Sequence, residues 1–244
     1  QARLTIDPGT RLEFASGTGL RVGLSNWGAY GGSLTAQGTP VAPIVFTARP
    51  GVTDWKGLYF DPYSGLFGNT SLLESCTISG AGGTWDSGII SNLRCYGTNQ
   101  PTLRDVTLSG GSGNALYALS STLSLCRVEA DSVGEAGLSL TSSVVQLDSV
   151  RVSQAGAEGL KISSTTVTGD SLEIRSCGSY AIRIGSGSRL DIDPERTQIV
   201  GNGVQAIELA GQTYTSDCRL ANFGVPYHVL SDLLVGKQSG QARL

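Results

Sequence analysis

The sequence predicts an all-β fold: a right-handed single-stranded parallel β-helix, a solenoid with about 22 residues and three strands in each coil. Three observations support this. A short motif, a small residue followed by alternating apolar residues, recurs every 22 residues through the middle of the chain. Two further sets of apolar residues repeat in phase with it. Glycine, 34 of the 244 residues, gathers in the turns between these sets. Such alternation is the period of a strand, and parallel crossovers are usually right-handed.

The recurring motif defines one strand position in each coil, which we call the first lane. Its copies begin at Gly57, Gly88, Ala115, Gly137, Gly159, Ala181 and Ala206. Each strand exposes backbone hydrogen-bonding groups, and the next coil satisfies them about 4.8 Å farther along. Stacked coils therefore need repeats in register at a constant spacing, whereas a β-sandwich does not.

Two more lanes complete each coil. The second lane carries Ile78, Leu108, Val128, Val152, Ile174, Ile199 and Leu220. The third lane carries Leu73, Leu103, Leu123, Val145, Val167 and Leu190. Cysteine stands two residues before the second-lane residue in three coils, at Cys76, Cys126 and Cys218. Counting by twos predicts that these thiols face inward as small hydrophobic groups. Their coils are not adjacent, so we expect free thiols rather than disulfides.

We expect one β-helix domain over residues 1–244. It divides into opening coils at 1–54, coils with longer insertions at 55–114, regular coils at 115–225, and a strand at 226–244 leading into a next copy. The expectation of a next copy comes from the tetrapeptide Gln-Ala-Arg-Leu, which begins the sequence and recurs at 241–244. The chain then reads as one unit of a tandem array, and the alternatives are coincidence or a cloning boundary.

Composition excludes several classes of function. The net charge is −3, from 17 basic and 20 acidic residues without a run of one sign, which argues against nucleic-acid binding. No apolar run approaches the roughly 20 residues of a membrane span. The single histidine, His228, leaves almost no material for a zinc site or a Ser-His-Asp triad. We therefore expect no metal and no cofactor.

The opening segments resemble bacterial secreted and cell-surface proteins of the right-handed parallel β-helix superfamily, which is pectate-lyase-like. The resemblance rests on Leu-Thr-Ile-Asp-Pro-Gly-Thr at 4–10, on Gly-Thr-Pro-Val-Ala-Pro-Ile-Val-Phe-Thr at 38–47 and on Trp-Lys-Gly-Leu-Tyr-Phe at 55–60. It covers about the first 85 residues. It implies the same fold and an extracellular or cell-surface location in a bacterium. It implies no single function, because the superfamily includes adhesins, passenger domains and polysaccharide lyases.

An enzymatic alternative has two candidate regions. Asp191 and Asp193 lie two residues apart and share one strand face. Asp193, like Asp7, precedes a proline, which favours a turn-forming role over catalysis. The outward positions of the first lane carry a cation-rich strip of Tyr59, Tyr117, Lys161, Arg183 and Glu208. Such a strip suits a polysaccharide, although it is also what an ordinary solvated face looks like.

The three tryptophans provide a binding alternative. Trp27, Trp55 and Trp85 all lie in the first third of the chain, where the coils carry long insertions. Exposed aromatic rings can form a platform for sugar rings, which makes these residues candidates for glycan binding. Trp55 also belongs to the Trp-x-Gly segment of the resemblance, where a structural role against a turn is the simpler interpretation.

The leading hypothesis is a structural module of a tandem-repeat secreted or cell-surface protein. Such a module would form a fibre, stalk or adhesin shaft by end-to-end stacking on copies of itself, with surface or extracellular polysaccharide as a further partner. The alternatives are a polysaccharide lyase or hydrolase and a non-catalytic glycan-binding module.

Overall fold

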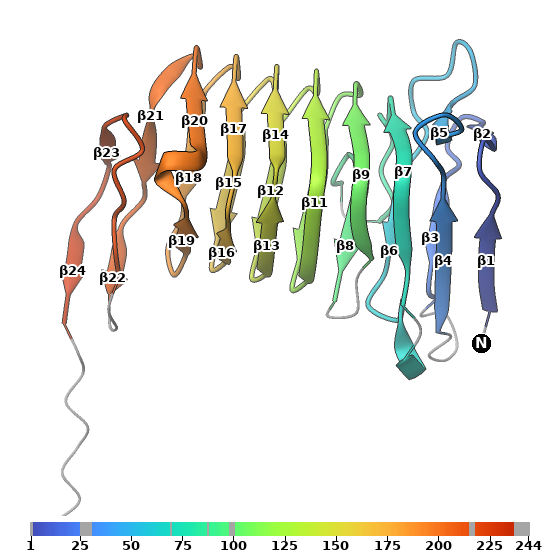
Figure 1. The fold of residues 1–244 in the computed structure, drawn as a ribbon, viewed down its shortest axis with the longest axis horizontal. Coiled ribbons are helices and arrows are strands. Elements are labelled where there is room, and N and C mark those ends of the chain that lie inside the picture. Colours follow the sequence, from blue (N-terminus) through green and yellow to red (C-terminus); the bar gives the residue numbers. More distant parts are fainter. Residues whose placement is uncertain are drawn as a thin grey trace, which may run out of the picture.

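The computed structural model describes residues 2–24, 31–68, 70–86, 88–97, 101–214 and 218–236. These residues form a parallel β-helix, as the lanes predict. Successive coils follow one another along a rod, and strands of the same lane lie side by side (Figure 1). The buried apolar side chains form one continuous core inside the coils.

The strands fall into the three expected lanes. The first lane is one ladder of β3 (Leu20–Val22), β6 (Leu58–Phe60), β8 (Ser91–Tyr96), β10 (Asn114–Leu119), β12 (Leu138–Thr141), β15 (Leu160–Ser163), β18 (Tyr180–Ile184), β21 (Val204–Leu209) and β23 (Tyr227–Val229). The third lane contains β1 (Ala2–Ile6), β4 (Gly32–Gln37), β13 (Val144–Asp148), β16 (Thr166–Gly169) and β19 (Arg189–Ile192). The second lane contains β2 (Arg11–Phe14), β5 (Ile44–Ala48), β14 (Val150–Ser153), β17 (Leu172–Arg175) and β20 (Thr197–Val200).

Three long strands run through both the third and the second lane: β7 (Leu72–Ser79), β9 (Thr102–Ser109) and β11 (Thr122–Asp131). Each bends at a residue with left-handed backbone, namely Ser75, Asp105 and Arg127 with φ of 48°, 53° and 52°. One coil later Ser149, φ 59°, separates β13 from β14 at the same corner. A left-handed residue turns the chain sharply, which lets one strand serve two faces of the solenoid.

This corner corrects the predicted second lane. Leu108 lies opposite Ala130, and Val128 lies opposite Val106. The left-handed residue interrupts the strict alternation of side chains, so counting by twos across it places a residue on the wrong face. Cys76 is inward and buried, as predicted. Cys126 is only half-buried and Cys218 is exposed, so the prediction of inward thiols is wrong for these two.

The first lane also needs one correction. The strand that lies opposite Leu58 and Leu116 contains Leu93, not the motif that begins at Gly88. Residues near Gly88 instead belong to an insertion, closed by an isolated bridge between Thr84 and Ile90. The segment at 88–91 begins with the small residue and isoleucine of the recurring motif, but only Leu93, Arg94 and Cys95 alternate apolar and polar side chains, and they pair with the neighbouring coils.

A buried column of hydroxyl side chains stabilises the corner between the first and third lanes. The backbone N–H of Ser121 donates to Oγ of Ser143 at 3.1 Å, and the N–H of Ser143 donates to Oγ1 of Thr165 at 3.2 Å. The Ser143 hydroxyl in turn donates to the carbonyl of Thr141 at 2.7 Å. Chain turns leave backbone donors without a strand partner, and these hydroxyls satisfy them.

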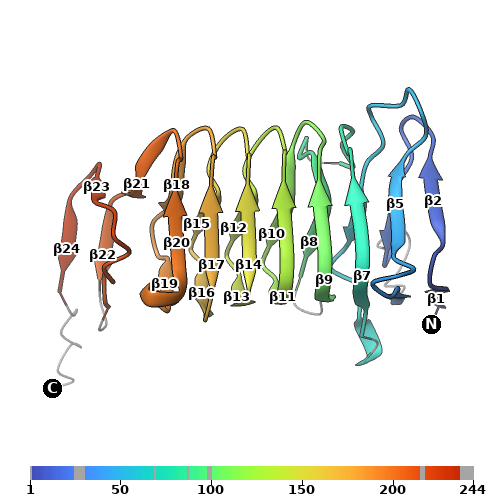
Figure 2. The same ribbon diagram turned by 45° about the horizontal axis from the view of Figure 1, so that its top comes forward.

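The C-terminal end adds a smaller pair of strands. β22 (Gln212–Tyr214) pairs in parallel with β24 (Leu233–Val235). In the described residues two short 3-10 helices interrupt the coils, η1 (Leu66–Gly68) and η2 (Pro194–Arg196). Strands β1 and β24 lie at opposite ends of the rod (Figure 2).

Candidate functional site

The first lane presents one outward column of polar and aromatic residues along the rod, which we call the first-lane column. Its members lie opposite one another in successive strands, in the order Arg21, Tyr59, Arg94, Tyr117, Ser139, Lys161, Arg183, Glu208 and His228. The strip predicted from the sequence, which contains Tyr59, Tyr117, Lys161, Arg183 and Glu208, is therefore confirmed as one column. Arg21 and His228 extend this column at its two ends, and Arg94 lies between Tyr59 and Tyr117.

An aromatic and arginine cluster occupies the N-terminal part of this column. The Tyr59 ring lies between two guanidinium groups, with Cζ of Arg21 5.1 Å and Cζ of Arg94 4.5 Å from the ring centroid. Trp85 packs against the same tyrosine at 5.8 Å between ring centroids, and Nζ of Lys56 lies 5.6 Å from the Trp85 ring. Cation–π contacts of this kind are stronger when they are removed from water.

Two carboxylates neutralise the arginines of this cluster. Asp61 is fully buried and accepts hydrogen bonds from Nε and Nη2 of Arg21 at 3.1 and 2.9 Å. Its other oxygen accepts from the backbone N–H of Tyr63 at 2.8 Å. Asp86 accepts from Nη1 of Arg94 at 2.8 Å. These contacts hold the chain that follows β6, and the insertion that precedes β8, against the first lane.

The cluster is closed to solvent at its centre. Tyr59 is 2% exposed and Arg94 is 5% exposed. Burial is the largest cause of a raised pKa at Tyr59. Two buried donors, Nε of Arg94 and Nε1 of Trp85, have no hydrogen-bond partner among the described residues. The arrangement is mainly a packed cluster that secures the long insertions, with unsatisfied donors at Arg94 and Trp85.

A second cluster occupies the C-terminal part of the column. The Arg183 guanidinium bridges two largely buried carboxylates, donating to Glu208 at 2.9 Å and to Glu158 at 3.3 Å. The hydroxyl of Tyr180 and Nδ1 of His228 lie 3.3 Å apart. Buried carboxylates require a partner of this kind. Arg183 is therefore a paired residue of the outer surface rather than a free cation.

The tryptophan predictions have different outcomes. Trp55 is fully buried, stacks on Phe14 at 4.8 Å between ring centroids, and donates from Nε1 to the carbonyl of Ser79 at 3.0 Å. Trp55 thus cannot form part of an exposed sugar platform, and Tyr59, at 2% exposed, offers no open ring in the outward strip; both expectations are corrected. Trp85 is half-buried, and Trp27 lies outside the described residues.

The remaining candidate residues lie on the outer surface of the coils. Lys161 is exposed and Tyr117 is half-buried. Oδ1 of Asp193 accepts from the backbone N–H of Glu195 at 2.9 Å and caps η2, as its turn-forming interpretation predicts. Asp191 is exposed on β19, opposite Thr168.

Sequence analysis missed Arg21, Arg94 and Asp61. Arg94 was missed because the first lane of its coil was assigned to Gly88, three residues before the strand β8 begins. The alternation of Leu93, Arg94 and Cys95 was the available signal. Asp61 lies just after β6, and no repeat in the sequence marks it.

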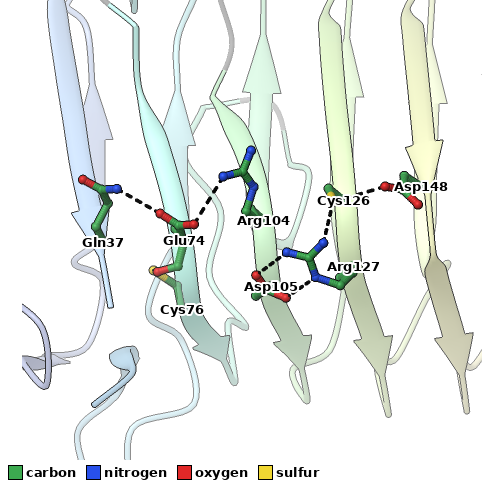
Figure 3. Close-up of polar contacts among 8 residues, drawn as sticks. All are labelled: Gln37, Glu74, Cys76, Arg104, Asp105, Cys126, Arg127 and Asp148. Atoms are coloured by element: carbon green, nitrogen blue, oxygen red, sulfur yellow. Dashed lines mark hydrogen bonds and ion pairs between the residues drawn. The ribbon is translucent and has the colours of Figure 1, made fainter. Parts of the chain in front are cut away.

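A third set of polar residues lines the corner between the third and second lanes (Figure 3). Arg127 makes a bidentate contact with Asp105 of the preceding coil, at 2.5 Å from Nε and 2.7 Å from Nη2. This contact is the largest cause of a lowered pKa at Asp105. Arg127 itself has the left-handed backbone that Ser75, Asp105 and Ser149 also have at this corner, although an arginine seldom does so.

Cys126 lies in the same corner between opposite charges (Figure 3). Nη1 of Arg127 is 3.2 Å from the sulfur, and Oδ2 of Asp148 is 3.4 Å from it on the other side. Burial, and then the Asp148 carboxylate, raise the pKa of the Cys126 thiol. The protonated thiol is therefore favoured, and it donates to Asp148.

Thiol labelling of the folded protein should separate the cysteines by environment. Cys218 is exposed and is expected to react first, with Cys126 slower, while the buried Cys76, whose pKa burial raises to about 11, stays protected with Cys95 and Cys177. Replacing Asp148 with asparagine removes a negative charge that opposes the thiolate. The pKa of Cys126 should fall and its labelling at pH 8 should speed up severalfold. Peptide mass spectrometry measures each rate.

The labelling rate of Cys218 in the Asp148→Asn variant is the internal control, because it should not change. Equal rates for Cys126 in the parent and the variant would show that the carboxylate does not govern this thiol.

Within the described ranges, no group of three or more His, Cys, Asp or Glu side chains is arranged to hold a metal ion. None of the described helical segments has the length and apolar character of a membrane-spanning helix. Comparisons with protein-family models, curated proteins and solved structures find no match for this chain. The resemblance to secreted β-helix proteins therefore stays a prediction.

Proposed function

We propose that this chain is a structural module, a rigid β-helix segment of an extracellular or cell-surface fibre or stalk, and that it extends by end-to-end association. The observation that carries the proposal is the contrast between the sides of the rod and its ends. The sides are polar and largely self-paired, whereas inward-facing apolar residues of the first and last described strands are exposed.

The charges along the sides pair with neighbours in adjacent coils. Nε of Arg151 lies 2.8 Å from Glu173 one coil further along, as expected of surface ion pairs between neighbouring coils. The other ion pairs between adjacent coils in the described residues are Arg21–Asp61, Arg104–Glu74, Arg127–Asp105, Arg183–Glu158, Arg183–Glu208 and Arg196–Asp170. Exposed ion pairs of this kind contribute little to the free energy of unfolding. They do balance opposite charges along the sides of the rod, so no patch of one charge forms there among the described residues.

The two ends differ from the sides. At the N-terminal end, the inward-facing Leu4 is 45% exposed because no described coil covers it. At the C-terminal end Val229 and Val235, the inward-facing residues of β23 and β24, are 50% and 85% exposed. Open solenoid ends also carry unpaired strand edges, which are templates for association.

The proposal predicts reversible association that depends on concentration. Sedimentation velocity should show the protein passing from monomer to longer species as its concentration rises, with scattering that reports elongation along one axis only. Val144→Asp is the matched control, because Val144 is an exposed apolar residue on the side of the rod. This control should associate like the parent. A parent protein that stays monomeric at millimolar concentration would overturn the proposal.

Glycan binding is a second candidate function, favoured by the half-buried Trp85 with its unpartnered Nε1. A glycan panel read by tryptophan fluorescence, with Trp85→Phe for comparison, tests it. A polysaccharide lyase or hydrolase has less support, because Arg183 bridges Glu208 of the column and the neighbouring buried Glu158 and so pairs with both carboxylates.

A further inference from the structure

We infer that Trp85 and Asp86, which we call the tip, occupy a binding position for an aromatic carboxylate on the side of the rod, and that such a ligand displaces them. The ligand class is a molecule that carries a carboxylate next to a flat ring. The tip belongs to the insertion that precedes β8. The inference does not depend on end-to-end association.

The contacts of the tip show which chemistry this position accepts. Oδ1 of Asp86 accepts a hydrogen bond from Nη1 of Arg94 at 2.8 Å. The Trp85 ring packs against the Tyr59 ring, with 5.8 Å between their centroids. Two adjacent residues thus place one carboxylate and one flat ring over the outward face of the first lane. A ligand that replaces both residues must provide the same two groups.

The charges around the tip favour an anion. Three cations lie against the two rings, whereas only two carboxylates form ion pairs with them in the described residues. One of these carboxylates is fully buried and belongs to the wall of the site, so displacing the other leaves two cations without an ion-pair partner. The cations are Arg21, Lys56 and Arg94, and the carboxylates are Asp61, which is the buried one, and Asp86.

The tip also leaves two buried donors without a partner. Nε of Arg94 and Nε1 of Trp85 accept no protein acceptor in the part of the chain that the structure describes. Both groups can only donate, and burying a donor without an acceptor is unfavourable. When the tip moves out, water reaches Nε1 of Trp85. A ligand carboxylate can then bind Arg94 through Nε and a terminal nitrogen together, as Asp61 binds Arg21.

The contacts that hold the tip are individually weak. The insertion closes through an isolated bridge between Thr84 and Ile90, outside the named strands. The Asp86 side chain is 53% exposed, although its partner Arg94 is 6% exposed, and ion pairs with exposed partners contribute little. Lys161, in the same column of a regular coil, is exposed. The outward face is therefore open where no insertion covers it, and displacing the tip uncovers the face without disturbing the coil beneath.

Indole-3-acetate, which joins an indole ring to one carboxylate, tests the inference by isothermal titration calorimetry. The parent protein should bind it weakly, because the tip competes for the same position. Asp86→Asn removes the competing charge and keeps the size of the side chain. Binding to this variant should be about fivefold tighter, the upper end of the range for a partly exposed ion pair. The neutral analogue indole-3-acetamide should bind both proteins about tenfold more weakly than indole-3-acetate.

Three further variants locate the binding. Asp105→Asn is the matched control, because it removes a carboxylate that pairs with Arg127 at a different corner, and it should bind like the parent. Arg94→Lys keeps the charge but loses the forked guanidinium, so binding should weaken about tenfold. Trp85→Ala should bind at least as tightly as the parent, because the indole belongs to the tip. Adding indole-3-acetate to the parent should speed hydrogen exchange of the Trp85 and Asp86 amides.

Each alternative outcome contradicts the inference. Equal affinity of the parent and Asp86→Asn means that Asp86 does not compete with the ligand. Equal affinity for the acid and the amide means that no carboxylate is recognised. Unchanged binding to Arg94→Lys places the ligand elsewhere, and a loss of binding in Trp85→Ala makes the indole part of the binding surface. No binding of indole-3-acetate at millimolar concentration to the parent or to Asp86→Asn means that no such site exists.

The result is decided even if a buried variant does not fold. Circular dichroism and the thermal midpoint establish whether Arg94→Lys is folded. If it is not, Asp86→Asn and the neutral analogue decide alone, because neither removes a buried group. All these outcomes are independent of the proposed structural function, which sedimentation tests separately.

Discussion

Replacing Trp55 with alanine is expected to lower the free energy of unfolding by about 3–5 kcal/mol, the usual cost of removing a large aromatic side chain from a core. The indole is fully buried and stacked on Phe14. Removing the indole leaves a cavity in the core of the opening coils. The Ser79 carbonyl also loses the hydrogen bond that Nε1 of Trp55 donates to it at 3.0 Å. Denaturant unfolding monitored by circular dichroism measures the loss.

Two variants make this result specific. Trp55→Phe keeps most of the volume and the stacking on Phe14 but loses the hydrogen bond, so its cost should be clearly smaller. Trp85→Ala removes a half-buried ring from the surface of the same region and should also cost less. If Trp55→Ala costs less than 1 kcal/mol, Trp55 does not have the structural role described above.

Replacing Asp61 with alanine is expected to cost about 3 kcal/mol or more, because removing one partner of a buried ion pair leaves the other charge uncompensated. Asp61 is fully buried, and the Arg21 side chain beside it is only 24% exposed. The same change also removes the acceptor for the backbone N–H of Tyr63. Chemical denaturation gives the free energy, and hydrogen exchange should show that opening spreads from the chain that follows β6.

A double-mutant cycle separates the charge effect from the loss of packing. Arg21→Met combined with Asp61→Ala should be more stable than Asp61→Ala alone, because the guanidinium that has lost the Asp61 carboxylate is then gone too. Asp86→Ala is the matched control for an exposed carboxylate, since its side chain is 53% exposed and its partner is also an arginine of this cluster. A loss at Asp86 equal to the loss at Asp61 would contradict the role of burial.

The repeat in the sequence predicted the solenoid because a parallel β-helix repeats the same environment in every coil. Inward residues such as Val145, Val167 and Leu190 lie opposite one another in successive coils, as the third lane predicts. Prediction failed where the chain leaves regular strand geometry. At Arg127 the left-handed backbone changes which side chains face inward. Near Gly88 an insertion carries the start of the recurring motif but is not the first-lane strand.

The candidate site was predictable only as a column. Alternation within strands is local, so it showed that Tyr59, Lys161 and Arg183 share one outward face. Whether a residue on that face meets solvent depends on what the insertions place over it. The insertion carrying Trp85 and Asp86 covers Tyr59 and Arg94, whereas Lys161, in a regular coil, stays exposed.

The sequence by itself determined the all-β solenoid, its 22-residue coil and the lanes that form its core, because these depend on spacing along the chain. Only the tertiary structure decided the face of Cys126, the burial of Trp55 and Tyr59, and the pairing of Asp61 with Arg21. These depend on contacts between residues up to 41 positions apart, as in the stacking of Trp55 on Phe14. Spacing along the chain predicts the periodic part of the fold. The surroundings of residues at corners and in insertions depend on which residues of neighbouring coils contact them.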